Sequence, residues 1–162
     1  MNLALERKYM KDVIKMTLVW MILFFAVPPM MLALYFKSLE EEIVLHQSEE
    51  EIIQIDLVYA PNDQFDILYT LKREEYADFL NELTDLKLQK STQPWETYGV
   101  LVVQLGYSDG SREILGATAV AYCTDDSEEM NGWYSLDISE MYSLFSGYVD
   151  LSHLPYLERA RG

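Results

Sequence analysis

The segment from Met16 to Phe36, MTLVWMILFFAVPPMMLALYF, carries no charged residue in 21 positions. At about 1.5 Å per residue, a helix of this length spans roughly 31 Å, the thickness of a bilayer's hydrocarbon core. A buried helix of a small soluble domain is rarely apolar on every face over such a length. Trp20 and Tyr35 stand near its two ends, where aromatic side chains favour the membrane–water interfaces. The pattern predicts a transmembrane helix over residues 16–36, with the lipid bilayer as its partner.

A cleaved signal peptide is the main alternative for this segment. Cleavage needs small residues at the positions −3 and −1 relative to the cut. The candidate site after the prolines, Met31-Leu32-Ala33, has a large methionine at −3. We therefore expect an uncleaved, single-pass signal anchor.

Two adjacent prolines, Pro28 and Pro29, lie within the apolar segment. Their missing N–H groups leave the carbonyls of Phe24 and Phe25 without helical donors, and a kink is expected there. A carbonyl without a hydrogen bond costs free energy in lipid. A neighbouring helix, a water molecule or a local adjustment of the helix should therefore satisfy these carbonyls. Pro28 and Pro29 are thus candidates for contact with a membrane partner, although a lone anchor with a tolerated kink fits them as well.

Lysine and arginine residues set the expected orientation of the anchor. Four of them precede the segment and only Lys37 follows it closely. Basic flanks stay in the cytoplasm, so the chain after residue 36 is expected outside it. The predicted order is a cytoplasmic basic flank (1–15), the transmembrane helix (16–36), an acidic stalk (37–50), an extracytoplasmic domain (51–150) and a C-terminal tail (151–162).

The part of the chain after Lys37 is strongly acidic. It holds 25 acidic and 7 basic residues, a net charge of −18. Such a domain is repelled by phosphates, which argues against nucleic-acid binding. Its 125 residues are enough for one domain with its own core. The single cysteine, Cys123, can form no disulfide within the chain and is expected as a small buried residue.

Apolar periodicity predicts an α+β fold with an antiparallel sheet and two helices packed on one face. In residues 51–60, alternation places Ile53, Ile55, Leu57 and Tyr59 on one face of a strand. Residues 98–117 form the clearest hairpin, turning at Asp109-Gly110. Apolar residues recur at helical spacing in residues 72–87 and 137–149, which predicts two helices. Asp137 is expected to cap the second helix. Residues 124–132 are expected as a polar loop.

No catalytic or cofactor motif is present in the sequence, and we expect no cofactor. His46 and His153 have no cysteine or histidine at ligand spacing and are interpreted as ordinary polar residues. The acidic run at 125–129 offers hard oxygen ligands for a divalent cation, but it lacks the spacing and the glycine of an EF-hand loop. A solvated loop is the simpler interpretation of its members, Asp125, Asp126, Glu128 and Glu129.

Trp95 and Trp133 are the candidate residues for binding a partner. Exposed aromatic side chains anchor interfaces and stack on sugars, although in a small domain most aromatic residues belong to the core. Trp95 lies in a loop next to Pro94, and Trp133 follows the acidic run.

The segments YGVLVVQLGYSDGSREI, NGWYSLD and ISEMYSLFSGYV together resemble uncharacterised bacterial proteins of Gram-positive type. The resemblance covers roughly residues 51–150. It implies one N-terminal anchor and a small extracytoplasmic α+β domain, and it implies no catalytic residues.

Three functions stay open at this point. The first is a membrane-anchored, non-enzymatic module that binds a protein or cell-envelope partner. The second is an accessory or regulatory subunit of a membrane complex that acts through Pro28 and Pro29. The third is an envelope enzyme or sugar-binding module, for which Trp95, Asp125 and His153 are the residues to test.

Overall fold

A computed structural model describes residues 15–17, 21, 27–37, 40–61, 64–91 and 97–157 of the chain. The chain divides into two compact units, Met1–Leu39 and Glu40–Gly162. We call the second unit the domain.

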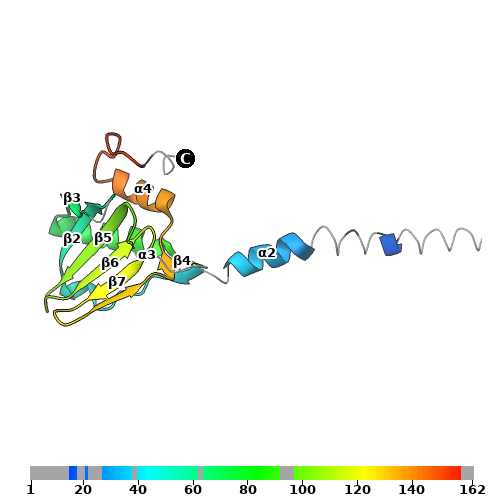
Figure 1. Cartoon of the computed structure of the whole chain (residues 1–162), viewed down its shortest axis with the longest axis horizontal. Helices are drawn as coiled ribbons and strands as arrows, with labels where there is room; N and C mark the ends of the chain where they lie inside the picture. Colours follow the sequence, from blue (N-terminus) through cyan, green and yellow to red (C-terminus); the bar gives the residue numbers. More distant parts are fainter. Residues whose placement is uncertain are drawn as a thin grey trace, which may run out of the picture. The chain divides into compact units, whose positions relative to one another are not determined.

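Helix α2, Val27–Lys37, is the main described element of the first unit (Figure 1). Pro28 and Pro29 belong to this helix, and their side chains are exposed. Part of the predicted transmembrane segment, including Trp20, Phe24 and Phe25, lies outside the described residues. Within the described part of the chain, no helix combines the length and the apolar character needed to cross a membrane.

Over its described residues, the domain consists of short strands and two α-helices, an α+β fold as predicted. Its elements in chain order are β1 (Glu40–Glu42), η1 (Glu49–Glu51), β2 (Ile52–Tyr59), β3 (Asp66–Thr70), η2 (Arg73–Glu75), α3 (Tyr76–Asp85), β4 (Lys87–Lys90), β5 (Leu101–Tyr107), β6 (Arg112–Gly116), β7 (Val120–Cys123), β8 (Glu128–Asn131), β9 (Tyr134–Ser135) and α4 (Ile138–Ser146).

Six of the described strands form one antiparallel sheet in the order β3-β2-β5-β6-β7-β8. Strands β5 and β6 are the predicted hairpin, and Gly110 in its turn has φ = +91°, a conformation that glycine adopts without strain. A second, three-stranded sheet in the order β1-β4-β9 was not expected from the sequence.

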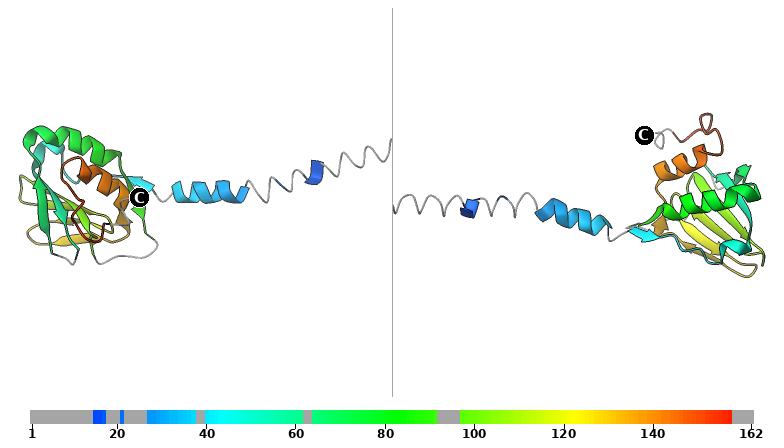
Figure 2. Two further views of the ribbon diagram at one scale, coloured as in Figure 1. Left: turned by 90° about the horizontal axis from the view of Figure 1, so that it is seen from above. Right: turned by 180° about the vertical axis from the view of Figure 1, so that it is seen from behind.

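Helices α3 and α4 pack on the same face of the six-stranded sheet (Figures 1 and 2). One core cluster joins their apolar stripes to the sheet residues Leu57, Val103 and Leu115. The stripes are those that the helical spacing predicts: Tyr76, Phe79, Leu80 and Leu83 in α3, and Met141, Leu144 and Phe145 in α4. The Asp137 side chain caps α4 by accepting hydrogen bonds from the N–H groups of Ser139 and Glu140.

The opposite face of the sheet carries a second, smaller apolar cluster, which includes Val58, Val102, Ile114 and Cys123. Cys123 is a free, buried cysteine, and burial raises the pKa of its thiol. It therefore behaves as a small core residue.

Two segments differ from the sequence-based expectation. Residues 40–50, expected within a stalk, belong to the domain because β1 pairs with β4 through main-chain hydrogen bonds. The predicted polar loop at 124–132 contains β8, which pairs with β7 along its whole length. Charged side chains are common on edge strands because they discourage pairing with further strands. Such strands lack the apolar alternation by which a strand is recognised in a sequence.

Smaller differences follow from local geometry. Ile53 is 63% exposed because a register shift between Ile52 and Gln54 breaks the expected alternation, and Ile52 is buried instead. The C-terminal tail packs on the domain as far as it is described: Leu151 and Leu157 are buried, and the Tyr59 hydroxyl donates to the carbonyl of Pro155.

Replacing Phe145 by alanine tests the packing of α4 on the sheet. The side chain is fully buried, so Phe145→Ala should lower the free energy of unfolding by about 3–5 kcal/mol. The measurement is urea denaturation of the full chain in detergent, followed by circular dichroism. Ser143→Ala on the exposed side of the same helix is the control, with an effect within about 0.5 kcal/mol. Equal effects of the two changes would contradict this packing.

Candidate functional site

A buried carboxylate, Glu113 on β6, organises the most polar region of the domain core. Its residue exposure is 3%. Register explains the position: Glu113 lies opposite Leu105 of β5 and Tyr122 of β7, so its side chain faces the side of the sheet on which the helices pack. A carboxylate in such a position must be hydrogen-bonded or paired, because desolvation of an ionised group is costly.

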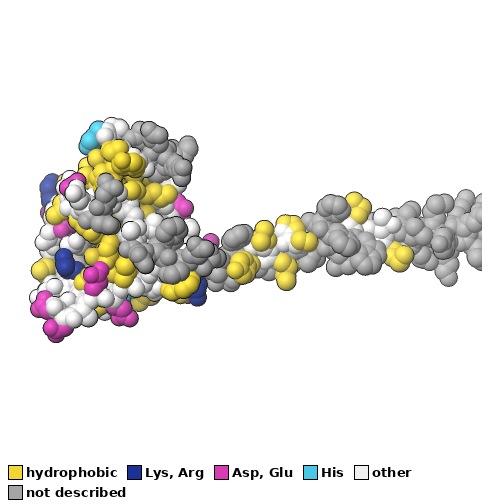
Figure 3. Space-filling model, in the orientation of Figure 1, with side chains coloured by type: hydrophobic (Ala, Val, Ile, Leu, Met, Phe, Trp, Pro, Cys, Tyr) yellow, Lys and Arg dark blue, Asp and Glu magenta, His cyan; other side chains and the backbone are white. Residues whose placement is uncertain are grey.

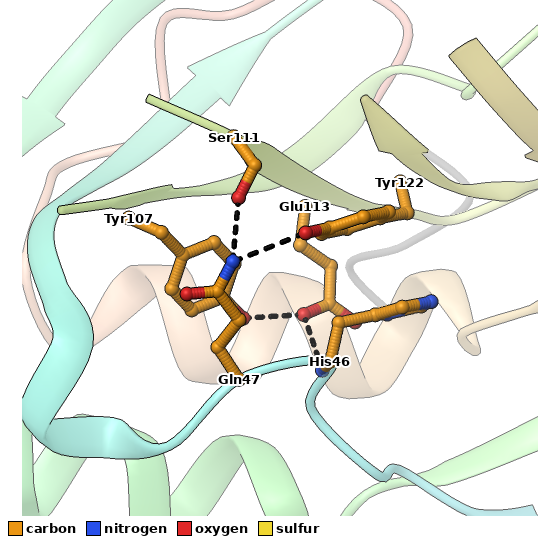
Figure 4. Close-up of polar contacts among 6 residues, drawn as sticks. All are labelled: His46, Gln47, Tyr107, Ser111, Glu113 and Tyr122. Atoms are coloured by element: carbon orange, nitrogen blue, oxygen red, sulfur yellow. Dashed lines mark hydrogen bonds and ion pairs between the residues drawn. The ribbon is translucent and has the colours of Figure 1, made fainter. Parts of the chain in front are cut away.

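Three donors satisfy Glu113 (Figure 4). The Tyr107 hydroxyl donates to Oε2 at 2.5 Å, and the backbone N–H of His46 donates to the same oxygen at 3.2 Å. His46 Nδ1 lies 3.2 Å from Oε1. An ionised carboxylate can only accept, so Nδ1 carries the proton in this contact. Burial, followed by the hydrogen bond to Glu113, raises the pKa of Tyr107 well above its usual value and keeps this donor protonated.

The His46 ring is also held by an aromatic neighbour. It stacks on Tyr122 with the ring centroids 4.2 Å apart and the planes 4° from parallel. The side chain remains 49% exposed, and the second ring nitrogen points away from the carboxylate (Figure 4). The ring is therefore fixed in orientation while one nitrogen stays accessible.

Gln47 makes a second set of contacts beside the first. Its Nε2 lies 2.8 Å from Asp109 Oδ2, 2.8 Å from Ser111 Oγ and 3.1 Å from the Tyr122 hydroxyl. Hydrogen bonds from the side chain and the backbone of Ser111, and then from Gln47, hold the pKa of Asp109 below its ordinary value of 3.8. His46 and Gln47 together pin the segment before β2 to the β5–β6 hairpin and to β7.

A small pocket of about 160 Å³ opens beside this network, and we call it the Glu113 pocket. Its walls contain two carboxylates, one amide and aromatic and aliphatic side chains. Its lining residues are His46, Glu113, Val120, Ala121, Tyr122, Glu129 and Asn131.

The structure separates the acidic residues that were considered for a divalent cation. Adjacent residues of a strand point to opposite faces. Glu129 lies opposite Tyr122 and lines the pocket, whereas Glu128 lies opposite Cys123 and accepts a hydrogen bond from the Tyr98 hydroxyl. Asp125 and Asp126 are exposed in the turn before β8. Over the described ranges, no group of three His, Cys, Asp or Glu side chains is arranged to hold a metal ion.

Of the other predicted site residues, Trp133 and His153 belong to the described part of the domain. Trp133 is 46% exposed between β8 and β9. Its backbone N–H donates to Oδ1 of Asn131, a residue that lines the pocket. Trp95 lies outside the described residues. His153 is exposed near the C-terminus, and Pro28 and Pro29 belong to the first unit.

Comparisons with protein-family models, with curated proteins and with solved structures found nothing that matches this chain. The resemblance to anchored Gram-positive-type proteins therefore stays a prediction.

The sequence interpretation missed the Glu113 pocket. One signal was present: in the hairpin, Glu113 shares a face with Leu115, a position that alternation marks as facing the core. A charged residue at such a position needs partners, and the sequence does not show that these come from His46, 67 positions away.

A double-mutant cycle tests the coupling of Glu113 and Tyr107. Glu113→Ala leaves the Tyr107 hydroxyl and the His46 N–H without an acceptor, which should cost about 1–3 kcal/mol for each orphaned donor. Adding Tyr107→Phe removes one of these donors, so the double variant should be more stable than additivity predicts. The free energies of unfolding of the four proteins are the measurement, and strict additivity would contradict the network.

Asp109→Asn tests the second set of contacts through its pH dependence. Because the folded-state pKa of Asp109 is depressed, its carboxylate stabilises the domain above the unfolded-state pKa, and this stability is lost as pH falls through the folded-state pKa. The variant should be less stable than the parent near neutral pH, and the difference should shrink below about pH 4. An NMR titration should place the Asp109 midpoint below 3.8 and, in Ser111→Ala, closer to 3.8. A midpoint unaffected by Ser111→Ala would contradict this assignment.

Proposed function

We propose that this chain is a membrane-anchored, non-enzymatic interaction module whose domain binds a protein or cell-envelope partner outside the cytoplasm. The uncharged segment 16–36, with four basic residues before it, supports the anchor and its orientation. The domain begins at Glu40, so only residues 38 and 39 separate it in sequence from α2.

The observation that carries a binding role is the Glu113 pocket. Two of its polar wall residues are held in place before any ligand arrives, because the His46 ring is held by a hydrogen bond and by stacking, and Glu113 by three donors. Preformed polar walls reduce the entropic cost of binding. On the face seen in Figure 3, acidic and basic side chains lie among apolar ones. The net charge of −18 on the domain suits a partner of opposite charge.

An envelope enzyme is the second candidate, and His46 is the observation that favours it. A carboxylate that holds one imidazole nitrogen and leaves the other accessible is the arrangement of a general base. The enzyme is the weaker candidate because, among the described residues, no serine, threonine or cysteine side chain is hydrogen-bonded to the His46 ring as a nucleophile would be. A hydrolytic activity that is abolished by His46→Ala would reverse this order.

An accessory subunit acting through the membrane segment is a third candidate. The exposed side chains of Pro28 and Pro29 on α2 favour it. Pro28→Leu combined with Pro29→Leu should then weaken a membrane complex while the domain stays folded, and an unchanged complex would count against it.

Cysteine labelling on intact cells tests the proposed topology. In a Cys123→Ser background, Ser127→Cys in the exposed turn before β8 should react with a membrane-impermeant maleimide. Asp12→Cys in the same background, placed in the basic flank, should react only after lysis. The reverse pattern would overturn the proposed orientation.

Photo-crosslinking on the same cells tests the binding role. A photoreactive amino acid at Glu129, on the rim of the Glu113 pocket, should yield a discrete crosslinked product. The same amino acid at the exposed Ser143 of α4 is the matched control and should yield none. The absence of a product at Glu129, or an identical product at both positions, would contradict a partner at the pocket.

A further inference from the structure

Within the described part of the chain, Glu113 has no lysine or arginine partner. The ion pairs formed within the described residues give it only His46, and no lysine or arginine side chain reaches it. A buried carboxylate is most stable beside a full positive charge that also donates hydrogen bonds. The domain as a whole carries a net charge of −18, so the surrounding potential also favours a positive ligand.

The acceptor atoms around the pocket are not all in use. An ionised carboxylate offers about four acceptor sites, and three donors reach Glu113, two of them at Oε2. Oε1 therefore keeps capacity for a further donor. The Glu129 carboxylate and the Asn131 amide project from the same face of β8, since they lie opposite Tyr122 and Val120. A ligand rich in N–H donors could be held from two sides, with the Val120 side chain as an apolar wall.

Size narrows the class of ligand. The pocket holds about 160 Å³, below the roughly 300–1,000 Å³ typical of small-molecule sites. This volume suits the head group of one side chain. A metal ion is disfavoured because the described residues supply no three-ligand group, and an anion is repelled by the two carboxylates.

We infer that the Glu113 pocket receives an arginine side chain presented by the protein partner. A planar guanidinium donates along two edges and can therefore contact both the Glu113 and the Glu129 carboxylates, whereas a lysine ammonium is a point charge. Arginine is also among the residues that anchor interfaces by filling a desolvated pocket. This inference rests on the proposed binding function and names the chemistry of the partner's contact.

The test is an NMR titration of the full chain in detergent with N-acetyl-arginine amide. Saturable shifts are expected at the backbone amides of the pocket walls, among them Ala121, Tyr122 and Asn131. N-acetyl-citrulline amide has nearly the same shape without the charge and should bind at least about tenfold more weakly. Equal binding of the two probes, or no saturable shift at these amides, would overturn the inference.

Two neighbouring acids provide matched variants. Glu129→Gln and Glu128→Gln change the net charge equally, one residue apart on the same strand, yet only Glu129 lines the pocket. Glu129→Gln should weaken arginine amide binding at least about tenfold, and Glu128→Gln should leave it nearly unchanged. Equal losses of affinity in the two variants would show that the probe is attracted only by the negative charge of the surface, and would overturn the inference. Glu129 is exposed, so this test does not depend on a variant of the buried Glu113.

The outcomes also separate this inference from the function beneath it. A crosslinked partner at Glu129 without binding of the arginine amide would contradict the proposed arginine contact but not the proposed interaction module. Specific binding of the arginine amide without a crosslinked partner would contradict the proposed interaction module but not the preference of the pocket for a guanidinium group.

Discussion

The carboxylate of Glu113 is the contact on which the polar side of the domain depends. It joins three parts of the chain: Tyr107 at the end of β5, its own strand β6, and the backbone and ring of His46 before β2. Each donor compensates part of the desolvation of the carboxylate, and each is held in place by it. An apolar residue at this position could fill the space, but it would leave the Tyr107 hydroxyl and the His46 N–H without an acceptor.

The sheet register makes this arrangement possible. Glu113 and Tyr122 lie directly opposite one another, so the carboxylate and the ring that stacks on His46 reach the same face. The same register places Glu129 beside Tyr122 and Glu128 on the other face. A shift of one residue between β7 and β8 would exchange the two acids and change the character of the pocket.

Local patterns predicted the parts of the fold whose interactions are local. The Asp109-Gly110 turn, the stripes of α3 and α4, and the Asp137 cap are encoded within a few residues, and the structure contains all of them. Strands β1 and β8 were missed because most of their side chains are charged or polar and their stability comes from main-chain pairing with neighbouring strands. The Glu113 pocket was missed for a related reason: His46 and Glu113 are ordinary residues in their own segments, and only the long-range fold brings them together.

The route by which the chain enters the domain has a mechanical consequence. Tension transmitted from residues before Glu40 would first meet β1, whose three residues pair with β4. The next resistance would be Ile43, which is buried in the main core cluster, and then His46 and Gln47, which are hydrogen-bonded to the β5–β6 hairpin and to Tyr122. Only after these contacts had yielded would the load reach β2, which lies between β3 and β5 in the larger sheet. Strand β2 is thus shielded from pulling by contacts in series, first the pairing of β1 with β4 and then the contacts of Ile43, His46 and Gln47.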